Sequence, residues 1–250
     1  MQRILGHMRR AVAEYDMIQD GDRICVGVSG GKDSLVLLCG LARLRQFIGI
    51  SFDIEAVTID PVFGGERCDY SAVTDLCGQL GIRHTVVVSE IGDIVFNIRK
   101  EKHPCSLCAH LRRGALHNAA VDLGCTKIAL GHSLDDAVET FFMNLFNEGR
   151  IGCFSPLTHL EKRDLYMIRP LIFAEEKEIR RAANRAGLPI VKSKCPADGN
   201  TNRQRMKEFV RDMEHRDHGF RERIFGAMRR GDIDGMGGVN YVPPVRKDVY

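Results

Sequence analysis

The chain has 250 residues, 44% of them hydrophobic, so it is long enough to bury a substantial core and fits one large domain with an appendage. Its formal net charge of +3 permits contact with polyanions but does not by itself indicate a nucleic-acid binder. Nine cysteines, an odd number scattered through apolar segments, are unlike the disulfide framework of a secreted protein and favour a reducing cytoplasm.

The first twenty residues are expected to form an amphipathic helix. Arginines and acidic residues are mixed there without the apolar stretch of a secretory signal. No run of 18 or more apolar residues occurs anywhere in the sequence, so we expect no membrane span.

Short β-rich runs then alternate with longer stretches in which apolar residues recur at helical spacing. The predicted strands are residues 23–28, 53–59, 84–88 and 127–130, and the predicted helices are residues 32–47, 67–80, 107–123, 134–146, 175–186 and 201–215. This rhythm is typical of βαβ units, and it predicts an α/β protein with a parallel sheet.

The strongest motif joins the first predicted strand to the helix that follows it. It reads Ser29-Gly30-Gly31-Lys32-Asp33-Ser34. A strand, a glycine turn and a helix N-terminus aim several backbone N–H groups and a partial positive charge at one point, which suits a phosphate. The motif is not a Walker loop, because Val26 stands where the first glycine of that loop would be and an aspartate follows the lysine.

A second motif follows the last predicted strand and reads Gly131-His132-Ser133-Leu134-Asp135-Asp136. Two adjacent carboxylates at the start of a helix can bind magnesium with the ATP phosphates, or one of them can steer a proton. Taken alone, the same carboxylates are also the charges that a helix N-terminus favours. His132 is open to a second interpretation, a hydrogen bond to the backbone of the turn.

A C-x-x-C pair, Cys105 and Cys108, stands at the start of a predicted helix and suits a metal or a redox pair. No second C-x-x-C completes four thiolates, so another residue has to contribute. Cys195 is the best third sulfur, because it lies in a loop of small and polar residues. The other cysteines fall within strand or helix patterns, where buried inert thiols are the default.

These stretches resemble the N-type ATP pyrophosphatases of the PP-loop superfamily and, more narrowly, the tRNA 2-thiocytidine synthetase (TtcA) family. The resemblance covers roughly residues 23–211 and rests on SGGKDS, on CSLCAHLRRGALHNAAVDLGCTKIALGHSLDD and on Ile168-Arg169-Pro170-Leu171. It implies a Rossmann-like fold of the HUP type, in which helices flank a five-stranded parallel sheet and ATP binds at the carboxyl ends of the strands. One departure is Cys195-Pro196-Ala197-Asp198, where the family commonly has a second C-x-x-C.

Under this resemblance the chain is a single catalytic domain with a helical C-terminal extension. Residues 1–20 form the N-terminal helix and residues 21–190 the PP-loop domain that carries the C-x-x-C. Residues 191–230 hold the third cysteine and a basic helical region, and residues 231–250 are expected to be a loosely held tail.

The resemblance also implies a reaction. ATP adenylates the C2 carbonyl of a cytidine in the anticodon loop of a tRNA, and sulfur then replaces the oxygen. A [4Fe-4S] cluster held by three cysteines keeps one iron free to take up sulfide. The implied residues are Ser29, Gly30, Gly31, Lys32, Asp33, Ser34, Gly131 and His132 for ATP, Asp135 and Asp136 for Mg²⁺ or catalysis, and Cys105, Cys108 and Cys195 for the cluster. Sulfur would come from a donor such as a cysteine desulfurase or from free sulfide, and a homodimer is left open.

Basic side chains near these motifs are the candidates for binding tRNA phosphates. They are Arg112, Arg113, Arg169, Arg203 and Arg205. Such charges would hold the anticodon loop, whose unpaired bases can be splayed into a pocket. For the last two, a solvated helix face with paired charges is the alternative, since Glu208 and Asp212 lie in the same stretch.

Two other functions remain open from the sequence. A PP-loop thiolase or desulfidase would act on another tRNA position or on a small thiolated base. A non-catalytic nucleotide-binding module would use zinc to staple the three cysteines, with His103 or His110 as fourth ligand.

Overall fold

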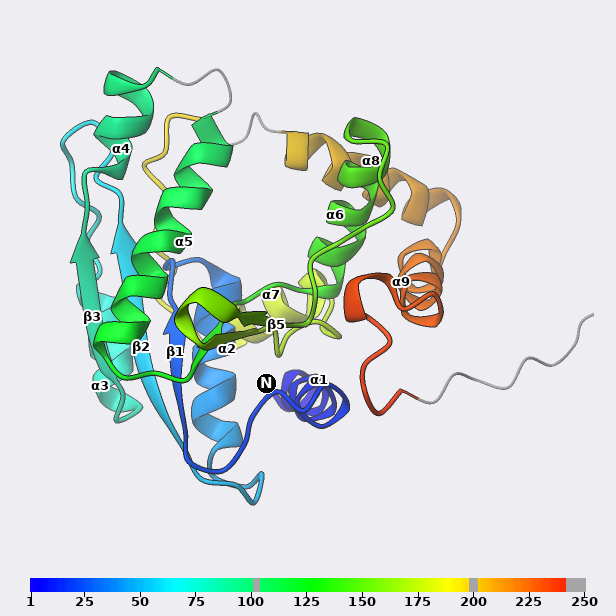
Figure 1. The fold of residues 1–250 in the computed structure, drawn as a ribbon, viewed down its shortest axis with the longest axis horizontal. Coiled ribbons are helices and arrows are strands. Elements are labelled where there is room, and N and C mark those ends of the chain that lie inside the picture. Colours follow the sequence, from blue (N-terminus) through cyan, green and yellow to red (C-terminus); the bar gives the residue numbers. More distant parts are fainter. Residues whose placement is uncertain (101–103, 198–201, 242–250) are drawn as a thin grey trace, which may run out of the picture.

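The computed structural model describes residues 1–100, 104–197 and 202–241. Its centre is one six-stranded sheet in the order β3-β2-β1-β4-β6-β5 (Figure 1). The strands are β1 (Asp22–Gly27), β2 (Phe52–Asp60), β3 (Arg83–Val88), β4 (Lys127–Ala129), β5 (Leu157–Leu160) and β6 (Leu165–Ile168). All neighbouring strands pair in parallel except β5, which pairs with β6 in antiparallel orientation.

Helices cover both faces of the sheet and extend beyond its β6 side. They are α1 (Gln2–Glu14), α2 (Lys32–Leu44), α3 (Ser71–Gln79), α4 (Ile91–Asp93), α5 (Pro104–Asp122), α6 (Leu134–Asn147), α7 (Glu176–Arg185), α8 (Asn202–Arg216) and α9 (Phe220–Arg230). Shorter turns are the π-helix η1 (Ile94–Ile98) and the 3-10 helices η2 (Glu161–Arg163) and η3 (Ile233–Gly235).

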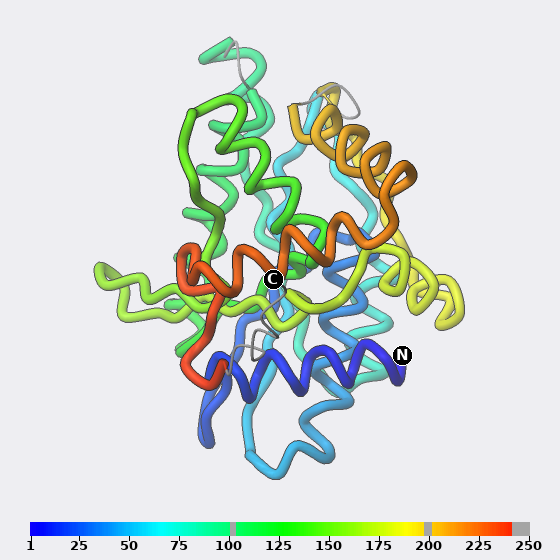
Figure 2. Tube along the Cα trace, turned by 90° about the vertical axis from the view of Figure 1, so that its right-hand side faces the viewer, coloured from blue at the N-terminus to red at the C-terminus, as the bar shows by residue number. Residues whose placement is uncertain are grey.

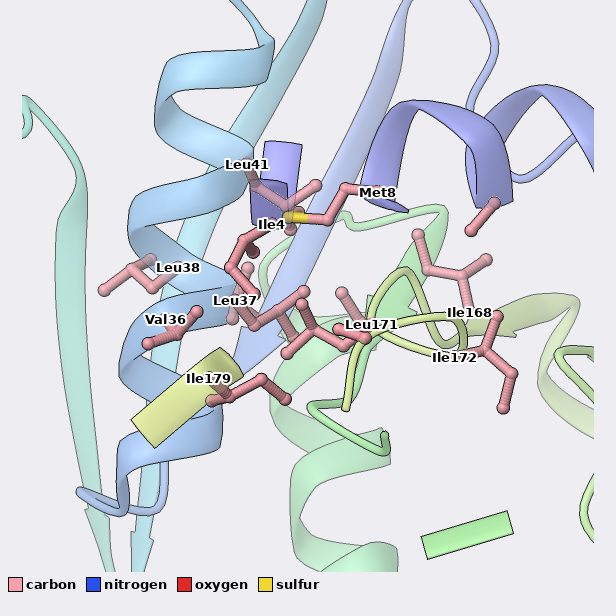
Figure 3. Packing of buried hydrophobic residues seen from close by; sticks show 14 of the residues in the cluster. Ile4, Met8, Val36, Leu37, Leu38, Leu41, Ile168, Leu171, Ile172 and Ile179 are labelled. Carbon is pink, nitrogen blue, oxygen red and sulfur yellow. The ribbon is translucent and has the colours of Figure 1, made fainter. Parts of the chain in front are cut away.

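The larger hydrophobic core lies between the sheet and helices α1, α2 and α7 (Figure 3). Ile4 and Met8 of α1 are buried one helical turn apart, which is the spacing of an amphipathic helix. Gly40 of α2 faces Met8, and a Cβ on this glycine would lie 2.4 Å from the Met8 sulfur. The glycine therefore lets α1 and α2 approach closely.

The second core lies on the opposite face of the sheet, beneath α4, η1 and α5. Leu116 and Ala120 of α5 are buried there against Cys25 of β1 and Ile128 of β4. This packing places α5 across the sheet and carries its first turn to the end where the parallel strands terminate (Figure 1).

Helices α6, α8 and α9 pack on one another beside the sheet (Figure 1), and their buried residues extend the larger core. An aromatic cluster joins them, because the ring of Phe142 in α6 lies 5.3 Å from that of Phe209 in α8 and 5.8 Å from that of Phe220. In the part of the chain that the structure describes, no helix has the length and apolar character needed to cross a membrane.

The four predicted strands and six predicted internal helices are all confirmed in place, as is the N-terminal helix. The β5–β6 pair, α4 and α9 were not predicted, so the expectation of five parallel strands is wrong by one antiparallel edge strand. The expectation of a loose tail is also wrong for residues 231–241. Met236 is fully buried, and its carbonyl accepts a hydrogen bond from Tyr15 Oη at 2.7 Å, which fastens this segment beside α1 (Figure 2).

Candidate active site

The predicted phosphate loop lies between the end of β1 and the first turn of α2. Gly30 has φ of +81°, and a Cβ there would approach the Cβ of Val191 to 2.8 Å, so this position favours glycine for two reasons. Ser34 Oγ donates to the carbonyl of Gly31 at 2.9 Å, and it accepts from the N–H of Ser29 at 3.2 Å. The two serines thus brace the loop around the helix N-terminus.

Lys32 is the first residue of α2 and is already ion-paired. Its Nζ lies 3.0 Å from Asp33 and 2.9 Å from Glu176, and its side chain is 23% exposed. Burial lowers the pKa of Lys32, but the charges of Asp33 and Glu176 outweigh burial and raise it overall. Lys32 is therefore a charged residue held near the loop, rather than the exposed lysine that a loop position suggests.

The second motif packs directly against the first. A Cβ on Gly131 would lie 3.0 Å from the backbone of Asp33, so a glycine is needed where the two loops meet. Ser133 caps α6, since its Oγ accepts from the N–H of Asp136 while the Asp136 carboxylate accepts from the N–H of Ser133 at 2.7 Å. The other oxygen of Asp136 accepts from Arg203 at 2.6 Å.

Asp135 and Asp136 are adjacent in sequence but differ in surroundings. Asp135 is buried, and one of its oxygens accepts from the Arg221 guanidinium while the other accepts from the N–H of Glu176 at 2.7 Å. Both oxygens of Asp135 thus join α6 to α7 and to the start of α9. Asp136 lines the cleft beside the phosphate loop, where Asp33 also lies.

Arg169, a candidate for RNA contact, is 7% exposed and is not available on the surface. It donates from Nε to Nδ1 of His132 at 3.1 Å and from Nη1 to the carbonyl of Ser155, and its guanidinium lies over the ring of Phe154. Burial, followed by the charge of Arg169, lowers the pKa of His132 to about 3. The assignment of Arg169 to RNA stays a prediction, because the side chain lines the cleft although it is buried. Its contacts fix a neutral His132 at the same cleft.

These elements enclose a cleft of about 390 Å³. Its polar lining comes from the phosphate loop, from His117 of α5, from Gly131, His132 and Asp136 and from the arginines Arg112, Arg113, Arg169 and Arg203. Its apolar lining consists of Val28, Val57, Ile59, Leu116, Ile128, Leu130 and Met167. An apolar wall beside a phosphate loop is the arrangement that a nucleotide requires.

The three candidate cluster ligands are near this cleft. Cys105 is exposed and Cys108 buried at the start of α5, whereas Cys195 is half-buried in the loop before α8. Burial raises the pKa of Cys108, and the nearby Cys195 and Cys105 raise it further against the opposing charge of Arg112. Within residues 1–100, 104–197 and 202–241, however, no set of three or more His, Cys, Asp or Glu side chains is arranged to hold a metal ion.

The structure also places the alternative fourth ligands and the other loop cysteines. His110, one alternative fourth ligand, is exposed, and His103, the other, lies outside the described residues. Cys68, before α3, and Cys153, between α6 and β5, are half-buried in loops, so the expectation that they belong to helices or strands is wrong.

The remaining basic candidates differ in their environment. Arg113 and Arg205 are exposed and Arg112 is half-buried. Arg203 is ion-paired with Asp136 and lies 3.7 Å from Glu139, which agrees with the alternative of paired charges for this helix.

The sequence motifs did not indicate two residues of the site, Glu176 and Arg221. Glu176 begins α7 and binds both Lys32 and Lys207, and these hydrogen bonds outweigh burial and lower its pKa to about 2. Arg221 reaches Asp135 from α9, which lacks a recognisable motif. The Lys32–Glu176 and Arg221–Asp135 pairs join residues more than 80 positions apart, so no local pattern marks them.

Comparison with known proteins agrees with this geometry. The family model of the PP-loop domain matches residues 4–214. The tRNA-cytidine(32) 2-sulfurtransferase of Geobacter sulfurreducens is 37% identical over 233 residues, which cover 91% of this chain and 89% of the relative. The protein of the same name from Pelobacter propionicus is 42% identical over 208 residues, covering 82% of this chain and 77% of the relative.

The fold is also found in a solved structure. The U34-tRNA thiolase NcsA from Methanococcus maripaludis, with its [4Fe-4S] cluster, superposes with a TM-score of 0.73 at 23% identity. The match covers 90% of this chain and 77% of NcsA, and it supports the architecture alone. On the evidence of the phosphate loop, the matched domain and these relatives, the chain belongs to the PP-loop family and, within it, to the tRNA-cytidine(32) 2-sulfurtransferases.

Proposed function

We propose that this chain is an ATP-dependent sulfurtransferase that converts the cytidine at position 32 of a tRNA into 2-thiocytidine. The observation that carries the proposal is the shared cleft. Ser29 and Ser34 of the phosphate loop line it together with Ala109, which directly follows the C-x-x-C pair on α5, and with Arg112 one helical turn after Cys108. Groups suited to ATP and groups suited to sulfur chemistry therefore face the same space.

The first half of the reaction is adenylation of the base. The C2 oxygen of a pyrimidine is a poor leaving group, and transfer of AMP makes it a good one. Lys32 and the N–H groups at the start of α2 stabilise the negative charge that develops on the departing pyrophosphate. Arg113 and His132, at the cleft wall, are placed to orient the nucleotide.

Magnesium fits between the two motifs. The carboxylates of Asp33 and Asp136 both line the cleft. Burial, together with the charges of Asp136 and Glu176, raises the pKa of Asp33 against the opposing charge and hydrogen bond of Lys32. Such a concentration of carboxylate oxygens suits Mg²⁺ bound to ATP phosphates. We assign the metal to these two residues and give Asp135 a supporting role, because Asp135 is buried and is absent from the lining of this cleft.

Cys105, Cys108 and Cys195 would hold a [4Fe-4S] cluster. Their donor chemistry fits, since three thiolates leave one iron free, and that iron supplies a binding site for sulfide. Cys195 lies in the loop before α8 and is near enough to the pair on α5 for its charge to raise the pKa of Cys108. A cysteine desulfurase or free sulfide would provide the sulfur.

The test is reconstitution. Purified protein with its cluster restored under anaerobic conditions is incubated with ATP, Mg²⁺, sulfide and tRNA from cells lacking the gene. Nucleoside mass spectrometry should detect 2-thiocytidine at position 32, and the nucleotide products should be AMP and pyrophosphate. An unmodified cytidine, or ADP as the product, would exclude the proposal.

Cysteine variants separate the cluster from a structural thiol. Cys195→Ser should lose bound iron and thiolation yet still bind ATP, because the phosphate loop is built from other residues. Cys68→Ser, another half-buried loop thiol, is the matched control and should keep both. A Cys195→Ser protein with full iron content and unchanged thiolation would remove the three-cysteine site while leaving the ATP site in place.

A further inference from the structure

His117 of α5 carries a buried nitrogen for which neither the fold nor the proposed chemistry provides a partner. Its Nε2 is shielded from solvent and has no hydrogen-bond partner. The same side chain lines the cleft described above. A buried imidazole nitrogen without a partner loses the hydrogen bond it would make to water, so such an atom on a side chain that lines a ligand cleft suggests a bond made only when the ligand is present.

The surroundings of His117 fit a base rather than a phosphate. The cleft brings the imidazole together with apolar side chains from the neighbouring helix turn and from three strands. These are Leu116 of α5, Val57 and Ile59 of β2, Ile128 of β4 and Met167 of β6. The faces of an adenine ring are apolar and its edge is polar, so apolar walls with one edge-directed polar group match it.

The imidazole is in the form that such a contact needs. Burial lowers the pKa of His117, and the charges of Arg163 and Arg113 lower it further. The ring is therefore neutral near pH 7 and has one nitrogen that donates and one that accepts. Arg163 itself donates to Asn118, which keeps that guanidinium at the side of α5 next to His117.

We propose that His117 determines the base specificity of the nucleotide site, with Nε2 accepting a hydrogen bond from the 6-amino group of adenine. This inference rests on the proposed use of the cleft for ATP. The phosphates occupy the loop at Ser29–Ser34, and the base extends along the apolar wall to His117. In this tautomer the proton is on Nδ1, so a nucleotide with an oxygen at position 6 of the purine would present an acceptor to the acceptor Nε2.

The test is a binding cycle in which the protein and the ligand each lose one partner of the proposed bond. Calorimetry compares ATP with purine riboside triphosphate, which lacks the 6-amino group, in the absence of tRNA. Wild-type protein should bind ATP about tenfold more tightly, as expected for one hydrogen bond in a partly buried site. His117→Phe, which keeps the ring but removes both nitrogens, should bind the two ligands equally.

His159→Phe is the matched control, because it changes another imidazole that stacks on Tyr166 and is absent from the cleft lining. It should keep the tenfold preference. His117→Gln retains an acceptor oxygen and should keep part of the preference, which separates loss of the bond from loss of the fold.

Three results would overturn the inference. Wild-type protein could show no preference for the 6-amino group, a result that needs no variant. His117→Phe could weaken both ligands by the same factor, as a packing role would. The His117→Phe variant could instead keep the preference for ATP over purine riboside triphosphate and lose affinity for tRNA. This result would assign the contact of His117 to the target base. Failure of thiolation alone would count against the proposed function and not against this inference, because the calorimetric comparison requires only nucleotide binding.

Discussion

At the scale of single residues, the charge at the phosphate loop is balanced before any nucleotide binds. Glu176 lies within ion-pair distance of Lys32, Lys207 and Arg180. A phosphate that enters the loop replaces the carboxylates as the partner of Lys32, so part of the binding free energy is spent on exchanging one ion pair for another. The gain is that Lys32 is positioned in advance.

Lys32→Ala should lower ATP-dependent pyrophosphate release by roughly two orders of magnitude, because the charge that stabilises the leaving group is lost. Its free energy of unfolding should change by less than about 1 kcal/mol, since Glu176 keeps Lys207 and Arg180 as partners. Pyrophosphate assays and urea titrations measure the two quantities. Lys177→Ala, which removes an exposed lysine of the same region, is the control. Undiminished pyrophosphate release would contradict the role of the loop.

The next prediction concerns Arg169, which acts through the residues that it hydrogen-bonds, His132 and Ser155. Arg169→Met should lower the free energy of unfolding by about 2 to 4 kcal/mol, because the Ser155 carbonyl and His132 Nδ1 lose their donor in a buried setting. The pKa of His132 should rise, since the Arg169 charge is one cause of its depression. Urea titration and NMR titration of the imidazole measure these effects. An unchanged His132 pKa would refute the coupling.

At the scale of elements, α6 has two functions that compete. Its N-terminus presents the Ser133 cap and Asp136 to the cleft, while one turn later it buries the carboxyl group of Glu139. Burial, followed by the charge of Asp136, raises the pKa of Glu139 from 4.5 to about 7, although Arg203 and Lys207 oppose the shift. Helix α6 thus buries a carboxyl group whose charged form is unfavourable there, one turn from the residues that line the cleft.

This burial predicts a dependence of stability on pH. Between pH 4.5 and about 7 the folded protein binds more protons at Glu139 than the unfolded chain, so stability falls as pH rises through that window. Glu139→Gln removes the titration. Relative to wild type, the variant should therefore gain about 2 to 3 kcal/mol between pH 4.5 and pH 8. Urea titrations at both pH values measure the free energy of unfolding of the two proteins. If the variant differs from wild type by the same amount at both pH values, Glu139 has an ordinary pKa.

Elements with a strong local pattern could be predicted from the sequence, and the others could not. The runs that became β1 to β4 are rich in β-branched residues, and their parallel pairing follows from the helices between them. The β5–β6 pair has four-residue strands, too short for a period to be visible. Helix α9 begins at Phe220 after a glycine with φ of +81°, and its helical pattern is carried by long-range contacts of Phe225 and Met228 with the core.

At the scale of the whole molecule, the site could be predicted only as far as its motifs extend. The glycines and serines of the phosphate loop act through backbone geometry and so are visible in sequence. The contact of Arg221 with Asp135 depends on how α9 packs against α6, and that of Lys32 with Glu176 on how α7 packs against α2. Tyr15 and Met236, 221 positions apart, show the same limit, because only the folded chain brings the C-terminal segment beside α1.

The distribution of charge over the molecule predicts how tRNA binds. The net charge is only +3, so a long-range field is a weak explanation for binding, and local basic side chains around the cleft have to supply it. Arg205 of α8 is exposed, on the same helix as Arg203 and Lys207, which approach the phosphate loop through Asp136 and Glu176. A tRNA whose cytidine enters the cleft would pass its backbone over this helix.

Arg205→Ala should therefore weaken tRNA binding and reduce the slope of log affinity against log salt concentration by about one, which is the signature of one lost phosphate contact. ATP affinity should not change, because Arg205 does not line the cleft. Arg43→Ala is the matched control, since this exposed arginine lies in the last turn of α2, eleven residues and about 16 Å along the helix from Lys32. Filter binding or fluorescence anisotropy over a series of salt concentrations measures both slopes. If Arg43→Ala lowers the slope as much as Arg205→Ala, the charges act through the overall field and α8 is not the path of the tRNA backbone.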